Sequence, residues 1–321
     1  MHEETVLSVV TPCYNEAENI SLFLAQLRGV LDSLAINYEV IAVDDGSTDS
    51  SWVELTGIPW PQLRGLRLVT NAGHQAAIDA GLRASRGSFV VTLDADGQHP
   101  APLIPALLET ATSQNCDVVY AVRTERLEES WFKRKTALWY YRFIRLLTGV
   151  PIQNNAADFR LMTRFTVSVL NDIPGNKVFR LLVPSLGFSF ATVEFQANQR
   201  LNGESKYSLR KMLALAIRSA LLFSTKPLRI VTGVGFVMAV LAGFWLLWVI
   251  IDFARGGTVA GWASQMSLTL VIGGVILFAL GILGEYVGMI FDRQANRPQF
   301  LIREQFPASN SGQNSEHEGP K

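Results

Sequence analysis

The chain has only two cysteines, Cys13 and Cys116, and they lie far apart in the sequence. They form neither a disulfide framework nor a zinc-like spacing, so we expect two unpaired thiols in a reducing compartment. Acidic and basic residues balance at 28 each, which excludes a general attraction to nucleic acid. Walker A and Gly-x-Gly-x-x-Gly motifs are both missing from the sequence, so the usual P-loop and Rossmann nucleotide sites are not expected.

Charged residues make up only 17% of the chain, and two long uncharged stretches lie late in the sequence, at 230–251 and 256–284. Because about 20 apolar residues cross a bilayer core, we expect two transmembrane helices within 228–291. The N-terminal apolar run 6–10 is too short for a signal peptide. The outer flanks of the two spans are basic, which predicts that both chain ends are cytoplasmic. These flanking residues are Lys226, Arg229, Arg293 and Arg297.

Apolar segments alternate with helical patterns over the first hundred residues. Strands that alternate with helices predict an α/β fold with a doubly wound, mostly parallel sheet and helices on both faces. The first helix is expected from about 16 to 34, with Asn15 as its N-cap. The expected strands are 6–10, 38–43, 66–70 and 89–93.

Polar motifs follow each expected strand directly. Ligands of parallel sheets bind beyond the carboxyl ends of the strands, so this common register predicts a binding site at that edge. The motifs are Tyr14 with Glu16, Asp44 with Asp45, Asn71 with Gly73, and Asp94 with Asp96.

The stretch FVVTLDADGQHP at 89–100 contains the most specific of these motifs, Asp94-Ala95-Asp96. A strand places residues i and i+2 on one face, so both carboxylates can point to the same spot. Two hard oxygen ligands suit Mg²⁺ or Mn²⁺ that also holds a diphosphate. The sequence therefore predicts a divalent-cation site here.

Seven stretches follow one another in the sequence: TPCYNEAENI, VDDGSTDSS, NAGHQAAIDAGLRASRG, TLDADGQHP, YAVR, ADFRLMTR and RLNGESKYS. Together they make residues 5–210 resemble a family 2 glycosyltransferase with the GT-A fold. They are typical of the branch that makes polyprenyl-phosphate hexoses, which includes dolichol-phosphate mannose synthases and bactoprenyl glucosyltransferases. The two C-terminal spans resemble those of the bacterial glucosyltransferase and aminoarabinose-transferase members.

This resemblance implies a membrane-bound inverting enzyme that moves a hexose from a nucleotide sugar to a polyprenyl phosphate such as undecaprenyl phosphate. It favours UDP-glucose, while GDP-mannose, UDP-aminoarabinose and other sugars stay open. It further implies Mg²⁺ or Mn²⁺, a homo-oligomer with a tetramer among the options, and a multi-pass location in the bacterial inner membrane with a cytoplasmic catalytic domain.

The resemblance also assigns roles to individual residues. The nucleotide sugar is expected at Pro12, Tyr14, Glu16, Asp44 or Asp45, Asp94, Ala95, Asp96 and Arg123. The metal is expected at Asp94, Asp96 and Gln98. The acceptor phosphate is expected at Arg134, Arg200, Ser205 and Lys206. The expected catalytic residues are Asp158, Arg200 and Lys206.

Three roles remain open for Asp158. It can orient the acceptor or an arginine, act as a general base, or form a structural ion pair with a neighbour such as Arg160. The acceptor chemistry bears on this choice, because a phosphate monoester with a second pKa of about 6 is already a nucleophile near neutral pH.

Basic, aromatic-rich segments at 131–148 and 206–227 predict interfacial helices on an anionic bilayer leaflet. The expected domains are a catalytic domain over 1–205, a juxtamembrane helix over 206–227, a two-helix membrane region over 228–291, and a tail over 292–321 that is disordered after about 306.

Other function classes also compete. A processive polysaccharide synthase of the same superfamily typically carries a Gln-x-x-Arg-Trp motif, whereas QANQRLNGESKYS has Arg200 and no tryptophan. A catalytically dead scaffold is disfavoured by the intact Asp94 and Asp96. A transporter is disfavoured because two spans make a poor path for a lipid.

Overall fold

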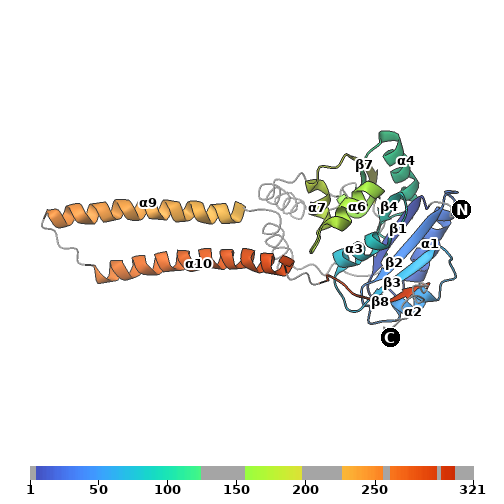
Figure 1. Ribbon diagram of the computed structural model, residues 1–321, viewed down its shortest axis with the longest axis horizontal. Coiled ribbons are helices and arrows are strands. Elements are labelled where there is room, and N and C mark those ends of the chain that lie inside the picture. Colours follow the sequence, from blue (N-terminus) through green and yellow to red (C-terminus); the bar gives the residue numbers. More distant parts are fainter. Residues whose placement is uncertain (1–4, 124–155, 197–225, 256–260, 295–297, 308–321) are drawn as a thin grey trace, which may run out of the picture. The chain divides into compact units, whose positions relative to one another are not determined.

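The computed structural model describes residues 5–123, 156–196, 226–255, 261–294 and 298–307 (Figure 1). These residues divide into two units. The first unit contains the described residues up to 196 together with 298–307, and the second contains 226–255 and 261–294.

The first unit contains one mixed sheet of eight described strands. These are β1 (Leu7–Cys13), β2 (Tyr38–Asp44), β3 (Leu63–Leu68), β4 (Phe89–Thr92), β5 (Val118–Arg123), β6 (Ala156–Thr163), β7 (Phe190–Phe195) and β8 (Ile302–Phe306). Their order is β7-β5-β6-β4-β1-β2-β3-β8 (Figure 1). The centre is parallel as expected, since β1 pairs with β2 and β4, and β2 pairs with β3. β6 runs antiparallel to β4 and β5, and β8 runs antiparallel to β3, so the sheet is more mixed than the sequence predicted.

Helices cover both faces of this sheet because apolar side chains alternate along its central strands. Val9 lies in one buried cluster with α1 (Ile20–Asp32), whereas Val10 lies in another with α3 (His74–Ala84). This confirms the doubly wound arrangement. The other helical segments of the unit are α2 (Ser51–Thr56), η1 (Ala101–Leu103), α4 (Ile104–Gln114), α6 (Arg164–Asp172) and α7 (Phe179–Ser185).

Strand β8 docks on β3 through a close fit that the sequence analysis did not predict. A Cβ atom at Gly65 would lie 2.0 Å from the ring of Phe306, so only glycine leaves room for that ring. The same ring meets Trp52 edge-on at a centroid distance of 5.6 Å. The β8 segment is therefore an integral edge of this sheet.

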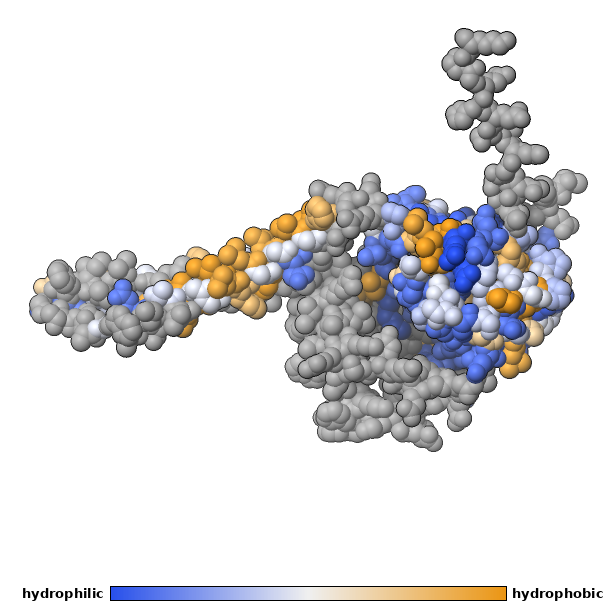
Figure 2. All heavy atoms as spheres, turned by 90° about the horizontal axis from the view of Figure 1, so that it is seen from below, coloured by the Kyte–Doolittle hydropathy of each residue, from blue (hydrophilic) through white to orange (hydrophobic). Residues whose placement is uncertain are grey.

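The second unit consists of two long helices in contact, α9 (Lys226–Ala254) and α10 (Trp262–Gln294). The stretch Val271–Gly288 of α10 is long and apolar enough to cross a membrane, whereas the apolar stretch Val231–Trp245 of α9 is shorter. Within the described ranges one helix thus meets the criterion, where the sequence predicted two. Large apolar side chains lie exposed along both helices, among them Phe236 and Phe278. Figure 2 shows apolar side chains on the visible face of this unit.

The predicted interfacial helix 131–148 lies outside the described residues, as does 206–225, which is nearly all of the predicted juxtamembrane helix. The segment expected to be disordered after about 306 is likewise outside them, apart from Pro307.

The Gly65–Phe306 contact generates a stability prediction. Phe306→Ala should lower the stability of the first unit by about 1–3 kcal/mol, because it empties a half-buried aromatic site and loosens β8. Thermal unfolding of the purified full-length protein in detergent measures this as a lower midpoint. Leu301→Ala is the matched control, since Leu301 is 58% exposed, and we expect it to stay within about 0.5 kcal/mol of wild type. Equal losses in both variants would contradict the proposed fit.

Candidate active site

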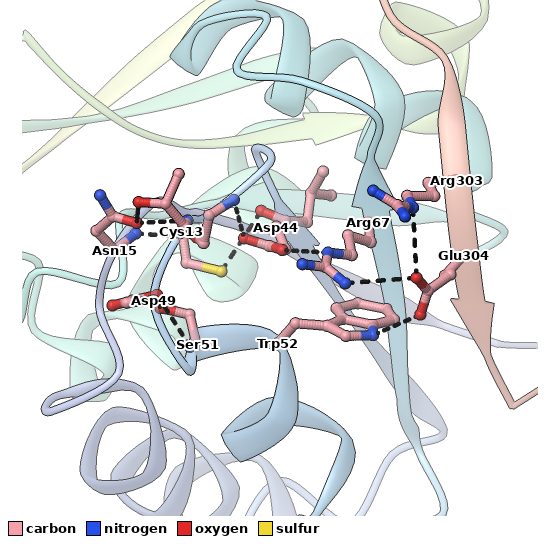
Figure 3. A network of polar contacts seen from close by, with 12 residues as sticks. Cys13, Asn15, Asp44, Asp49, Ser51, Trp52, Arg67, Arg303 and Glu304 are labelled. Atoms are coloured by element: carbon pink, nitrogen blue, oxygen red, sulfur yellow. Dashed lines mark hydrogen bonds and ion pairs between the residues drawn. The ribbon is translucent and has the colours of Figure 1, made fainter.

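The loops after β1 and β2 are joined into one unit by Asn15. Its backbone N–H donates to Ser47 Oγ at 2.9 Å, and its side-chain Oδ1 accepts from Thr48 N at 2.9 Å (Figure 3). Asn15 has a φ of 54°, in the left-handed region that few residues other than glycine and asparagine adopt. The first helix begins at Ile20 with Asn19 as its N-cap, so the prediction that Asn15 caps it is wrong. Asn15 instead holds the two loops together.

The three nucleotide residues expected on the β1 side occupy different environments. Pro12 is buried within β1, Tyr14 is 43% exposed, and Glu16 is half-buried. Burial raises the pKa of Glu16, and Asp96 raises it further against a lowering hydrogen bond from Asn19. Glu16 therefore lies within electrostatic range of the expected metal site, and Tyr14 offers a free aromatic surface beside it.

Asp44 and Asp45 are both buried and both use their oxygens on the protein itself. Asp44 Oδ1 accepts from Ser47 N at 3.1 Å, and its Oδ2 lies 3.4 Å from Nε of Arg67. The two oxygens of Asp45 accept from Ala72 N at 2.8 Å and Gly73 N at 3.0 Å. Burial raises the pKa of Asp45 despite these bonds. The contact of either carboxylate with a nucleoside thus stays a prediction.

The expected metal and diphosphate residues lie together in the turn after β4. Asp96 Oδ1 accepts from Gln98 N at 3.0 Å, and Gln98 Oε1 accepts from Arg123 NH2 at 2.9 Å. The strand ends at Thr92, so the predicted reason for their proximity, alternation along a strand, is wrong. A tight turn with Gly97 at a φ of 74° brings these side chains together. Ala95, between the two aspartates, is buried in the core.

Two histidines that the sequence analysis did not select lie against Asp94. His74 Nε2 is 3.2 Å from Asp94 Oδ1 and 3.8 Å from Asp158 Oδ2, so it bridges the two carboxylates. His99 Nδ1 accepts from Asp94 N at 3.1 Å, which leaves this nitrogen without a proton, and burial lowers the pKa of His99. The position of His74 directly after the Asn71–Gly73 loop was the available signal in the sequence.

Asp158 forms a close ion pair with Arg160, whose NH2 lies 2.5 Å from its Oδ1. Burial alone would raise the pKa of Asp158, but the charges of Arg160 and Arg180 outweigh it and hold that pKa below its usual value. The structural ion pair considered for Asp158 is therefore formed. A carboxylate with a lowered pKa is a weak base.

The oxygen ligands near Asp94 fit a divalent cation that shares its coordination with a substrate. Burial raises the pKa of Asp94, and the nearby charges of Asp158 and Asp96 raise it further against His74 and His99. A cation would relieve this repulsion. Within the described part of the chain, no three His, Cys, Asp or Glu side chains form a complete metal cage. Water and substrate oxygens would therefore complete the shell, as is usual for Mg²⁺.

The residues expected at the acceptor phosphate, Arg134, Arg200, Ser205 and Lys206, lie outside the described residues. Their roles stay predictions. The described site thus contains the expected nucleotide and metal residues together with Asp158.

Family models match two parts of the chain. A model described as glycosyl transferase family 2 matches residues 8–179, and one described as a GtrB C-terminal hairpin matches residues 226–290.

Relatives match the chain along most of its length. The glycosyltransferase YkcC of Bacillus subtilis is 35% identical, and the alignment covers 94% of this chain and 95% of YkcC. The bactoprenol glucosyl transferase of Shigella phage SfX is 33% identical, over 92% of this chain and 98% of the relative. A prophage bactoprenol glucosyl transferase homolog of Escherichia coli K12 is 32% identical, with the same coverage.

Solved structures resemble the fold at low identity. Mannosyl-3-phosphoglycerate synthase of Rubrobacter xylanophilus has a TM-score of 0.50 at 16% identity, covering 67% of this chain and 72% of that one. Glucosyl-3-phosphoglycerate synthase of Mycobacterium tuberculosis has a TM-score of 0.50 at 19% identity, covering 68% and 80%. These two likenesses support the GT-A-like fold alone.

The left-handed backbone of Asn15 generates a prediction about nucleotide binding. Asn15→Gly keeps access to this backbone and loses the bond to Thr48, so we expect the Kd for UDP to rise about threefold. Asn15→Ala loses the bond to Thr48 and the easy access to the left-handed backbone, which costs an alanine about 1–2 kcal/mol. We therefore expect the Kd for UDP to rise at least about tenfold. Isothermal titration calorimetry on the full-length protein measures both.

Asn115 supplies the control for this pair of variants, because it also has a positive φ, 47°, at the end of α4. Asn115→Gly and Asn115→Ala should change stability and leave the Kd for UDP unchanged. Wild-type affinity in both Asn15 variants would show that this residue does not organise the loops.

Proposed function

The chain belongs to glycosyl transferase family 2, and from that premise we propose that it transfers glucose from UDP-glucose to a polyprenyl phosphate. It is a glycosyltransferase whose bactoprenol relatives match the catalytic part and the hairpin alike. The observation that carries the proposal is the cluster of Asp94, Asp96, Gln98 and Arg123 beside Asp158 at the carboxyl edge of the sheet. A polyprenyl phosphate such as undecaprenyl phosphate is the acceptor in this proposal.

The sugar donor would bind across the joined loops and the turn after β4. Tyr14, exposed beside these loops, offers a surface for the base. Arg123, held by Gln98, supplies positive charge for the diphosphate. Asp94 and Asp96, with Gln98 in reach, would hold Mg²⁺ or Mn²⁺, which when bound neutralises the leaving diphosphate.

Asp158 acts in this proposal as an orienting group. The acceptor phosphate has a second pKa of about 6 and is largely dianionic near neutral pH, so its attack at the anomeric carbon requires no strong base. Asp158 is ionised by its pairing with Arg160, and His74 ties it to Asp94. It can therefore fix the arginine and the histidine around the reacting groups. Arg134, Arg200, Ser205 and Lys206 are proposed to neutralise the acceptor phosphate.

The second unit fits a hairpin that crosses the membrane twice, with the catalytic unit on the cytoplasmic side. The hairpin family model spans both α9 and α10, and exposed side chains such as Phe244 and Leu277 need an apolar environment. A polyprenyl chain is expensive to draw into water, at about 0.8 kcal/mol per CH₂. The enzyme must therefore meet its acceptor at the bilayer surface, where the segments 131–148 and 206–227 are proposed to lie. A homo-oligomer is part of the proposal.

A sugar-transfer assay tests the proposed function. Purified full-length protein is mixed with undecaprenyl phosphate, a divalent cation and labelled nucleotide sugars, and label is counted in the organic extract. We expect transfer from UDP-glucose in preference to GDP-mannose, UDP-aminoarabinose and UDP-N-acetylglucosamine. Preference for another sugar would correct the donor, and label in polymer would indicate a polysaccharide synthase. Absence of transfer from every nucleotide sugar would refute the proposal.

Two variants control this assay. Asp94→Asn should lower the rate by at least about a hundredfold, because it weakens charge stabilisation at the diphosphate. Asp172→Asn makes the same change at an exposed position at the end of α6 and should leave the rate unchanged. Excess EDTA should abolish wild-type transfer if a divalent cation is required.

The lowered pKa of Asp158 generates a pH prediction. A carboxylate whose folded pKa lies below its usual value of about 3.9 stays ionised throughout the working range, so it cannot cause a loss of rate near pH 6. We expect the rate to fall as the pH drops through about 6, because the acceptor becomes a monoanion. Asp158→Asn should lower the rate and leave this acid limb in place. If the fall in rate below about pH 6 shifted to another pH or disappeared in Asp158→Asn, Asp158 would be the titrating base.

A further inference from the structure

The edge strand β8 places a glutamate directly opposite an arginine of β3. In the antiparallel ladder, Arg67 pairs with Glu304 and Leu66 with Gln305. Cross-strand partners present their side chains on the same face of a sheet. Figure 3 shows Arg67 and Glu304 meeting in this way, with Asp44 on the far side of the arginine.

Arg67 joins two carboxylates from different strands. Its Nε lies 3.4 Å from Asp44 Oδ2 and its NH1 lies 3.4 Å from Glu304 Oε1. Its guanidinium also lies over the ring of Trp52 at 5.8 Å, and Trp52 Nε1 donates to Glu304 Oε2 at 2.9 Å. The arginine is therefore held by a strand that lies far away in the sequence.

Asp44 depends on this arginine. Its side chain is fully buried, and among the described residues its Oδ2 has no hydrogen-bond partner. A buried charge without a counter-charge is strongly unfavourable, and Arg67 supplies the counter-charge to this carboxylate. Asp44 Oδ1 in turn accepts from Ser47 N, and Ser47 Oγ accepts from Asn15 N. The contacts thus run from Glu304 through Arg67 and Asp44 to the loop of Tyr14.

We propose that Arg67 is a positioning residue for the donor nucleotide, and that Glu304 on the strand after α10 holds Arg67 in place. The inference rests on the proposed function, because it concerns the same nucleotide site. Without Arg67 the buried carboxylate of Asp44 loses its counter-charge, and the loops that Ser47 and Asn15 join lose their anchor. The segment that follows the hairpin therefore contributes to sugar-donor affinity.

The position of Glu304 separates this role from the docking of β8. Glu304 is 46% exposed, whereas the packing of β8 depends on Phe306 against Gly65 and Trp52. In Glu304→Gln the amide oxygen can still accept from Trp52, while the charge beside Arg67 and beside the exposed Arg303, whose Nε lies 3.7 Å from Glu304 Oε1, is lost. This substitution therefore weakens the hold on the Arg67 guanidinium and leaves β8 docked on β3.

The test measures UDP binding by calorimetry and steady-state kinetics on the full-length protein. Glu304→Gln should raise the Kd for UDP and the KM for the sugar donor about threefold, the range of a partly exposed ion pair. Arg67→Gln should raise them at least about tenfold, because the buried Asp44 loses its counter-charge. Arg67→Lys, which keeps charge without the planar fork, should fall between them. In all variants kcat and the acceptor KM should stay within about twofold.

Two comparisons decide the outcome. The double variant of Arg67→Gln and Glu304→Gln should match Arg67→Gln alone, because Glu304 acts through the arginine. Glu194→Gln makes the same change at an exposed position on β7, the opposite edge of the sheet, and should bind UDP as wild type does.

Additive effects in the double variant, or wild-type UDP affinity in Arg67→Gln, would overturn the inference. A lower melting temperature with unchanged UDP affinity would also overturn it. Should Arg67→Gln fail to fold, the Kd for UDP of Arg67→Lys and Glu304→Gln still tests the inference, and wild-type affinity in both would overturn it. Failure of the wild-type protein to bind any nucleotide would instead refute the proposed function.

Discussion

The constraint on which the rest of the structure depends is the burial of negative charge at the carboxyl edge of the sheet. Asp44, Asp45, Asp94 and Asp158 all lie there, and an ionised group removed from water requires compensation. The compensating groups come from different elements: an arginine on β3, backbone N–H groups before α3, a histidine at the start of α3, and an arginine on β6. Asp44 therefore links β2 to β3, and Asp45 and Asp94 link the turns after β2 and β4 to the start of α3. Asp158 pairs within its own strand, β6.

The degree of compensation divides these carboxylates into two kinds. Asp158 is compensated by an arginine whose charge lowers its pKa, and both oxygens of Asp45 accept backbone bonds, although burial still raises the pKa of Asp45. They can set geometry without any ligand present. Asp94 is under-compensated, and burial with its acidic neighbours raises its pKa. A preorganised edge with an anion that lies among other carboxylates, as Asp94 does, is what a site needs when a cation arrives together with its substrate.

Much of the fold and part of the site could be predicted from the sequence, because both follow from local patterns. Alternating strands and helices predicted the parallel centre, and the motif after each strand predicted which loops meet. The departures depend on long-range contacts that no local pattern encodes. β6 enters between β4 and β5, β8 pairs with β3 from the far end of the chain, and the left-handed backbone of Asn15 is stabilised by the neighbouring loop. His74 was passed over because its place after the Asn71–Gly73 loop was a weak signal, and its role shows only once Asp94 and Asp158 are placed around it.

The position of β8 in the chain has a consequence for biosynthesis. Until this strand pairs, β3 presents an open row of backbone N–H and C=O groups, the kind of edge that recruits other chains. The ribosome synthesises β3 long before β8, and both hairpin helices are made in between. The nascent sheet therefore keeps a bare edge while α9 and α10 are made, and β8 closes that edge only afterwards. Translation order thus makes synthesis of the hairpin precede completion of the sheet.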